Sequence, residues 1–320
     1  MIRLDPATTS PAPIAPPIVP AWALVADSGL SDADAAFRAG AALGALDTLA
    51  RAQVSWAGVW RQRLALRCAA AAVRLAGRSE DEAALRDAWF LRPADGGPGP
   101  AGNILNAWRQ LASHQPVIDA ERLAGVVELL GLRWEDAFAD LPRTIDDLIR
   151  SGRPAPFATA AIAGQVVALS SGTELLAWWC ADLVLAQKLR WPRSIPMLVA
   201  QAFAPAFRTD DGRGKRIRPA DQKEFERAVC RALAQGADDA LRLAGELSRR
   251  AERLAAVAPK LRAKGAGDVV KRLLDDDAVP GSLTTKNLSR FATRRLFERL
   301  QQLEAVRELS GRTTFRMFGL

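Results

Sequence analysis

The residues of this chain that are best suited to chemistry are basic and lie near its carboxyl end. They include Lys286, Arg290 and Arg294, and the polar Thr293 lies among them. Side chains of these types hydrogen-bond to base edges in the DNA major groove, which just accommodates an α-helix. The helix expected over 290–304 turns its apolar side inward, so these four residues are left pointing outward near its start. We therefore predict a DNA-recognition helix, with the four side chains as its readers.

The net charge supports this location. Residues 241–320 hold 17 Lys or Arg and 9 Asp or Glu, whereas residues 1–240 hold 27 of each, so the whole excess of +8 lies in the last quarter. A basic region attached to a neutral body is typical of a phosphate-binding module. Charge alone fits a solvated basic helix equally well, so the interpretation depends on the elements that carry the charges.

Helical periodicity predicts helices over 268–276, 283–288 and 290–304. In the third helix the apolar face is expected to comprise Phe291, Leu296, Leu300 and Leu303. The aspartates at 275–277 follow the first helix, and we expect this charge run to be solvated. Close to a DNA-binding face it would repel phosphate.

Two short alternating runs, over 306–309 and 314–318, predict a β-hairpin that turns at Ser310 and Gly311. Arg312 and Arg316 on this hairpin are expected to contact phosphates. The order helix, helix, helix, strand, turn, strand indicates a winged helix-turn-helix. Some winged helices bind protein, so a docking partner remains an alternative to DNA.

The rest of the chain predicts a mainly α fold without a strand before residue 300. We divide it into a disordered proline-rich tail (1–30), an all-helical body (31–257), a linker (258–266) and the winged helix-turn-helix (267–320). The body helices are expected over 31–52, 59–76, 81–90, 103–112, 119–130, 134–150, 156–169, 173–189, 195–204 and 221–257.

The chain resembles the alphaproteobacterial family called domain of unknown function 1403. The stretches that carry the resemblance include WAGVWRQRLAL (56–66), GRSEDEAALRDAW (77–89), WWCADLVLA (178–186) and VAPKLRAKGAG (257–267). The resemblance implies a bacterial protein with no assigned activity. The ending from Leu283 to Leu320 also resembles the winged helix that closes many bacterial Fic-type proteins, which implies that the body is a degenerate Fic-like helical fold.

Fic nucleotidyl transferases use a His-x-Phe-x-Asp-Gly-Asn-Gly-Arg loop with the histidine as general base. The segment FRTDDGRGK (207–215) matches its glycines, but Phe207 stands in place of the histidine and cannot take a proton. We therefore predict no enzyme activity. Arg213, Lys215 and Arg216 remain candidates for phosphate contact, the alternative being a solvated loop.

Other chemistry is sparsely represented. His114, the single histidine, is expected to interact with the end of its own helix, and the three cysteines, Cys68, Cys180 and Cys230, are expected to be buried free thiols. We predict no metal site and no cofactor. The absence of a long apolar run and of a signal peptide predicts a cytoplasmic protein that does not enter a membrane.

Our leading hypothesis is a non-enzymatic protein that binds double-stranded DNA, as a regulator or a replicon accessory factor. The alternatives are a protein-interaction adaptor that docks a partner on the winged helix, and a catalytically inactive Fic-like protein that binds nucleotide. A positive recognition face would favour DNA, whereas an exposed apolar stripe would favour a partner helix. The sequence carries no signal for an oligomeric state.

Overall fold

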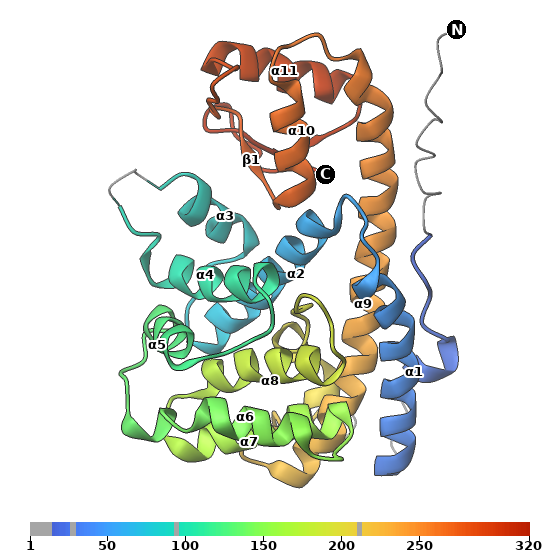
Figure 1. Ribbon diagram of the computed structural model, residues 1–320, viewed down its shortest axis with the longest axis vertical. Coiled ribbons are helices and arrows are strands. Elements are labelled where there is room, and N and C mark those ends of the chain that lie inside the picture. Colours follow the sequence, from blue (N-terminus) through green and yellow to red (C-terminus); the bar gives the residue numbers. More distant parts are fainter. Residues whose placement is uncertain (1–14, 26–29, 93–95, 210–212) are drawn as a thin grey trace, which may run out of the picture.

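The computed structural model describes residues 15–25, 30–92, 96–209 and 213–320. These residues form helices throughout, with one small sheet near the carboxyl end, which confirms the prediction of a mainly α fold (Figure 1). The helices are α1 (Asp32–Arg51), α2 (Ala57–Leu75), α3 (Glu82–Phe90), α4 (Gly99–Ser113), α5 (Ala120–Leu129), α6 (Leu141–Arg150), α7 (Ala155–Leu169), α8 (Glu174–Lys188), α9 (Gln222–Val257), α10 (Ala266–Asp275) and α11 (Arg290–Gln302). The strands are β1 (Val279–Pro280), β2 (Arg307–Glu308) and β3 (Met317–Gly319).

Local capping explains why the body helices begin where the sequence predicts. At the start of α1, the Ser31 hydroxyl accepts a hydrogen bond from the Asp34 backbone N–H at 3.1 Å, and the Asp34 carboxylate accepts from the Ser31 backbone N–H at 3.3 Å. This reciprocal pair is a capping box. Asp81 caps α3 by a single bond, its carboxylate accepting from the Ala84 N–H at 2.9 Å. Gly77, with a φ of +75°, follows the end of α2 in the left-handed conformation that glycine tolerates best.

The core is built around α8 and α9. Every residue of α8 from Leu175 to Ala186 is buried, and α9 packs against α1, α2 and α7. Buried tryptophans tie the layers together by hydrogen bonds as well as by packing: Trp60 donates to the Ala240 carbonyl at 2.9 Å, and Trp179 donates to the Ala107 carbonyl at 3.0 Å. These rings therefore belong to the core, as their apolar surroundings in the sequence predict.

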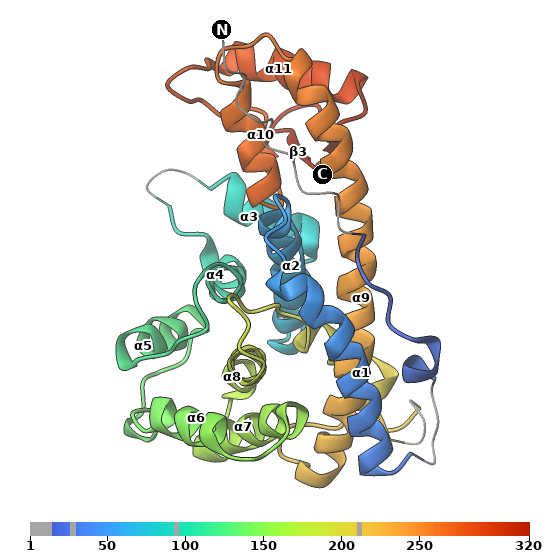
Figure 2. The same cartoon turned by 45° about the vertical axis from the view of Figure 1, so that its right-hand side comes forward.

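The last residues, 266–320, form a separate layer that we call the C-terminal module. It comprises α10, α11 and the sheet, and it lies at one end of the molecule, beside the C-terminal half of α9 and above α2 and α3 (Figures 1 and 2). The sheet has the strand order β1-β3-β2 and is antiparallel, with Val279 opposite Phe318 and Arg307 opposite Gly319. The expected small β-structure is therefore present, with a third strand that the sequence did not predict.

Buried ion pairs attach this module to the body. Asp277, between α10 and β1, accepts hydrogen bonds from Arg63 of α2 and from Arg86 of α3, the latter at 2.6 Å. Burial alone would raise the pKa of Asp277, but the two guanidinium groups hold it below its ordinary value. Beside it, Asp276 receives both Nη atoms of Arg109 at 2.9 and 3.0 Å. The expectation that this aspartate run is solvated is therefore wrong for Asp276 and Asp277.

Three further predictions need correction. Residues 15–25 belong to the expected disordered tail, yet Val19 and Ala23 are buried and Trp22 stacks on Phe37 of α1 at 5.4 Å. Residues 1–14 and 26–29 of that tail lie outside the described part of the chain. The helix expected over 195–204 is an irregular segment with a single 3₁₀ turn, and β1 is a strand before residue 300.

The irregular segment after α8 is organised by a buried acid. Asp182, in the middle of α8, accepts hydrogen bonds from the backbone N–H groups of Met197 and Leu198, each at 3.2 Å. Burial raises the pKa of Asp182 to about 7, even though these two bonds favour the charged form. The carboxyl group thus replaces the backbone pairing that a helix would have supplied.

The attachment of the module predicts a large effect of Asp277→Asn. The substitution leaves the buried Arg63 without a counter-charge and leaves Arg86 only its more exposed pair with Glu82 at 3.5 Å, so the free energy of unfolding should fall by about 3 kcal/mol or more. Urea denaturation would measure this. Asp275→Asn, an exposed neighbour in the same charge run, is the matched control and should change stability by less than about 0.5 kcal/mol. Equal effects of the two substitutions would contradict the buried ion pair.

Asp182 predicts a pH dependence. Its folded-state pKa of about 7 exceeds the unfolded value of about 3.9, so the folded state binds more protons between these pH values and its stability falls as pH rises through them. Asp182→Asn removes this term. The melting temperature of the variant should therefore rise relative to that of the parent between pH 5 and pH 8, whereas Asp275→Asn should follow the parent in parallel. A constant difference for Asp182→Asn would refute the raised pKa.

Candidate nucleic-acid interface

α11 lies at the outer end of the C-terminal module, on the side away from the body (Figures 1 and 2). Ser289 caps its start, because the hydroxyl accepts a hydrogen bond from the Ala292 N–H at 3.3 Å. The inward face contains Leu296, Phe297 and Leu300, and the Phe297 ring stacks on Phe318 of β3 with a centroid distance of 4.3 Å. This packing fixes which face of α11 remains open to solvent.

The open face is basic. Lys286, Arg290 and Arg294 are exposed, as predicted. Arg294 forms an ion pair with Glu298 one turn along the helix, at 3.1 Å, and its side chain is still 74% exposed. Lys286 and Arg290 have no hydrogen-bond or ion-pair partner through their side chains within the described part of the chain.

Two further exposed arginines, Arg295 and Arg299, extend this surface along α11 and were missed from the sequence. Arg299 lies 3.4 Å from the amide oxygen of Gln302, and no acidic partner of Arg295 is found among the described residues. Both follow Phe291 at intervals of four residues, and because Phe291 was expected to point inward, helical spacing gave no sign that this side of α11 is exposed. The surface is therefore a strip along α11 and is not confined to its first turn.

Leu296 and Leu300 of α11 face inward as predicted, but two other residues of the helix lie on the opposite side from the prediction. Thr293 was expected to point outward, but it is fully buried and its hydroxyl donates to the Leu283 carbonyl at 2.7 Å. Phe291 was expected to point inward, but its side chain is 80% exposed. The two corrections have one cause: the buried set at 293, 296, 297 and 300 occupies the inward arc, which leaves position 291 on the outer side.

The segment before α11 is not the expected helix. Residues 283–288 form a turn closed by an isolated bridge between Thr285 and Leu288. The turn brings the Leu283 carbonyl under α11, where Thr293 binds it. A helix there would have paired that carbonyl within the segment, so the buried threonine and the missing helix are two aspects of one local arrangement.

The two hairpin arginines make intramolecular contacts. Arg312 forms an ion pair with Asp87 of α3. Arg316 lies 2.8 Å from the Glu308 carboxylate and 2.8 Å from the side-chain oxygen of Gln301. A phosphate would therefore have to compete with carboxylates for both guanidinium groups.

A hollow of about 250 Å³ separates α11 from the β2–β3 connection. Its lining includes Arg290, Arg294 and Phe315. Phe315 is 67% exposed and has a φ of +54°, a conformation that costs free energy for a residue other than glycine. An aromatic ring thus lies beside two of the predicted readers, Arg290 and Arg294.

The second predicted basic segment, residues 213–216, lies at the other end of α9. Arg213 and Lys215 are exposed, whereas Arg216 is held by both carboxylate oxygens of Glu174 at 2.6 and 3.1 Å. The module contacts α9 from Glu246 onward, 24 residues after the helix starts at Gln222, so about 36 Å of helix separates this segment from the module. It cannot contribute to the same surface as α11.

Phe207, where a Fic enzyme would have its general base, is a core residue. Its ring packs against Trp178 at 5.0 Å and against Phe225 at 5.5 Å. An aromatic side chain is thus required here for packing. Asp211 and Gly212, which match the Fic pattern, lie outside the described residues.

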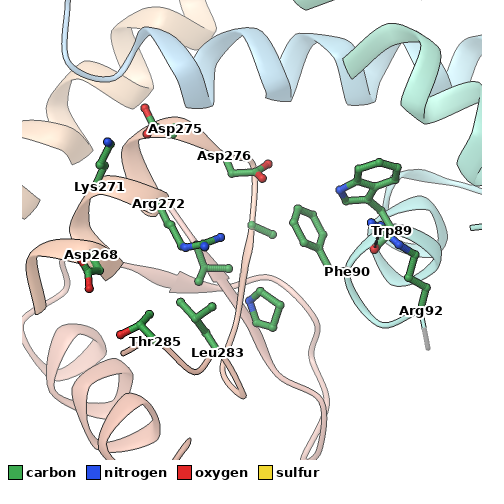
Figure 3. A pocket seen from close by; sticks show the side chains of 13 residues that line it. Trp89, Phe90, Arg92, Asp268, Lys271, Arg272, Asp275, Asp276, Leu283 and Thr285 are labelled. Atoms are coloured by element: carbon green, nitrogen blue, oxygen red, sulfur yellow. Dashed lines mark hydrogen bonds between the residues drawn. The ribbon is translucent and has the colours of Figure 1, made fainter. Parts of the chain in front are cut away.

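Figure 3 shows an open cleft of about 870 Å³ between α3 and α10. Trp89 and Arg92 lie on one side, with the Arg92 guanidinium 4.2 Å from the Trp89 ring centre. On the other side lie three acids, Asp268, Asp275 and Asp276, and two bases, Lys271 and Arg272; with Arg92 the cleft has three of each. The charges that line this cleft therefore favour neither an anion nor a cation.

The remaining reactive groups have structural roles. His114 ends α4, and its Nδ1 atom lies 2.9 Å from the Gln110 carbonyl, as predicted. Cys68, Cys180 and Cys230 are buried free thiols, and burial raises the pKa of Cys180 and of Cys230 to about 12. Over the described ranges, no group of three or more His, Cys, Asp or Glu is arranged to hold a metal ion. Nor does any described helix combine the length and apolarity needed to cross a bilayer.

Comparison with known proteins adds the family. A search of the curated proteins found no match. The family model described as "Protein of unknown function (DUF1403)" matches residues 8–320, which include the body, the buried Asp277 attachment and the whole C-terminal module. The chain therefore belongs to the family of proteins of unknown function DUF1403.

Proposed function

We propose that this protein binds double-stranded DNA, without enzymatic activity, through the exposed face of α11. The observation that carries the proposal is the strip of arginines at 290, 294, 295 and 299 on the outermost helix of the molecule. Guanidinium groups contact both phosphates and guanine edges, and a helix fits the major groove. As part of the same proposal, we place the protein in the bacterial cytoplasm, acting as a regulator or an accessory factor of a replicon.

The order of elements in the C-terminal module supports a winged-helix interpretation. α10, β1, the turn over 283–288, α11 and the β2–β3 pair follow one another, and β3 lies in the middle of the sheet. In this interpretation the first helix of the helix-turn-helix is shortened to the turn. α11, with 13 residues and a length of about 20 Å, takes the place of the recognition helix.

The contacts revise the residues that would bind DNA. Lys286, Arg290 and Arg294 are retained as DNA-binding residues, and Arg295 and Arg299 are added. Thr293 is removed from the set, because its hydroxyl binds the Leu283 carbonyl inside the module. Arg312 and Arg316 would contribute only after exchanging their carboxylate partners for phosphates. Five exposed cations predict a salt dependence with a log–log slope of up to about −4.5.

A second candidate function is docking of a protein partner on the same face. The exposed rings of Phe291 and Phe315 favour it, because aromatic side chains with arginine neighbours are common anchors of protein interfaces. Phe291→Ala separates the two candidates: it should disrupt a protein complex while leaving the phosphate contacts of the arginines in place. No contact of Phe207, or of the described residues of its loop (208–209 and 213–216), supports a nucleotide site in the body.

The DNA proposal is tested by Arg290→Gln combined with Arg294→Gln in the full-length chain. Affinity for random-sequence duplex DNA, measured by fluorescence anisotropy, should fall at least tenfold, and the salt slope should become shallower by about 2. Arg143→Gln with Arg150→Gln on α6 is a matched control, since Arg150 is also 74% exposed and also pairs with an acidic residue one turn away. Undiminished binding by the α11 variant, or equal losses in both variants, would overturn the proposal.

For Thr293, in contrast to the arginines, we predict an effect on stability and none on DNA affinity. Thr293→Val removes the hydrogen bond to the Leu283 carbonyl, so the free energy of unfolding should fall by about 1 kcal/mol. DNA affinity of the folded variant should stay within about twofold of the parent. The exposed Thr314→Val serves as the control for stability. A tenfold loss of DNA affinity in Thr293→Val at unchanged stability would restore Thr293 as a reader.

A further inference from the structure

A second large cleft, of about 790 Å³, lies where α9 passes the C-terminal module. One wall is a face of α9, and the other is formed by the end of α11, by β2 and by Leu320. The lining residues are Glu246, Arg249, Arg250, Arg253, Gln301, Glu304, Ala305, Val306, Arg307, Glu308 and Leu320. This cleft is separate from the outer strip of α11 and from the cleft between α3 and α10.

Helical spacing gathers the arginines of one wall. Positions 246, 249, 250 and 253 follow the i, i+3, i+4, i+7 pattern, so they share one face of α9. β2 adds Arg307 from the opposite wall. Four guanidinium groups from two parts of the chain therefore border the same space.

The carboxylates of the cleft do not balance these cations. Glu246 pairs with Arg250 and lies 3.4 Å from Arg307, and Glu304 lies 2.8 Å from Arg253. The third acid, Glu308, is held by Arg316, which does not line the cleft. The Leu320 oxygen is likewise already contacted by Arg63 at 3.4 Å.

The excess of positive charge is clearest at Arg249 and Arg250. Arg249 is exposed and has no side-chain hydrogen bond or ion pair with any described residue. The Nη1 atom of Arg250 is buried without an acceptor. Burial lowers the pKa of Arg250, and the charges of Arg307, Arg63 and Arg249 lower it further, although Glu246 acts in the opposite sense. An added negative charge would relieve this repulsion.

We propose that the cleft between α9 and the C-terminal module binds a small phosphate-bearing anion, held by Arg249, Arg253 and Arg307. Guanidinium forks suit phosphate oxygens, and three of them converge here from opposite walls. The space has the size of common small-molecule sites. No aromatic residue is among the described lining, so recognition would rest on the phosphate and not on stacking of a base.

Such an anion would bridge α9 and the module. It would join them on the side of the module that β2 and the end of α11 form, whereas Asp277 joins the module to α2 and α3. Binding should therefore stabilise the folded chain in proportion to occupancy. This inference does not depend on DNA binding by α11.

Pyrophosphate is a suitable probe, with the full-length protein at constant ionic strength. Thermal unfolding and titration calorimetry should show a saturable rise in melting temperature and a binding isotherm. Arg249→Gln combined with Arg307→Gln should raise the dissociation constant at least tenfold. Both the α6 pair, Arg143→Gln with Arg150→Gln, and the α11 pair, Arg290→Gln with Arg294→Gln, should leave it within about twofold of the parent.

A variant that should bind pyrophosphate more tightly is also needed, because a gain of affinity cannot result from misfolding. Glu304→Gln removes an exposed carboxylate that competes for Arg253, so pyrophosphate should bind more tightly. Arg249→Gln alone, which breaks no internal pair, should weaken binding severalfold without loss of fold. The proposal is overturned by an absence of saturable binding, by unchanged affinity in the Arg249 and Arg307 variants, or by a loss that follows the α11 pair instead.

Discussion

A single buried carboxylate, that of Asp277, fixes the architecture of this molecule. It is inserted between two helices of the body and receives the guanidinium groups of Arg63 and Arg86. Arg63 also reaches the backbone oxygens of Asp277 and Leu320, so one side chain links α2 to both ends of the sheet region. The direction in which α11 faces, and the width of the clefts on either side of the module, all depend on this attachment.

A charge at this depth is costly to desolvate, and an apolar contact of the same size could have supplied as much stability. The charge adds a unique position for the module, because a shift by one helical turn would leave Asp277 and Arg63 without partners and Arg86 with Glu82 alone. Around this centre lie more exposed ion pairs, Arg312 with Asp87 and Arg253 with Glu304. Such exposed pairs contribute little stability. The exposed pairs lie at the edge of the module, whereas Asp277 attaches its centre to the body.

Features encoded by neighbouring residues could be predicted from the sequence. The capping box at Ser31, the helix over 222–257 and the role of His114 all rest on contacts within a few positions along the chain. The partners of Asp276 and Asp277 could not be predicted in this way, because they lie 167 to 214 residues away. From local sequence, three consecutive aspartates resemble a solvated run.

At the candidate site, too, some features could be predicted from neighbouring residues and others could not. The basic character of the segment and the presence of a helix over 290–302 were predictable. The inward positions of Leu296 and Leu300 were predictable too. The sides of Thr293 and Phe291 were not predicted correctly: Thr293 continues the 296, 297 and 300 face and is bound by the Leu283 carbonyl of the preceding turn, whereas Phe291 lies off that face. Thr293 and Phe291 were therefore assigned to the wrong sides together.

The separation of Arg63 and Asp277 also has a consequence for synthesis. A ribosome that adds about 5 to 20 residues per second needs roughly 10 to 40 seconds to make the 214 residues between them. α1 and α2 emerge first, yet α1 packs on α9 and α2 on α10. α2 also packs on α3 and α4, which follow it closely, but α1 must wait for α9, and the attachment of α2 to α10 forms last. For this chain, completion of the fold is an event that follows release of nearly the entire polypeptide, and the early helices are the natural clients of chaperones during that interval.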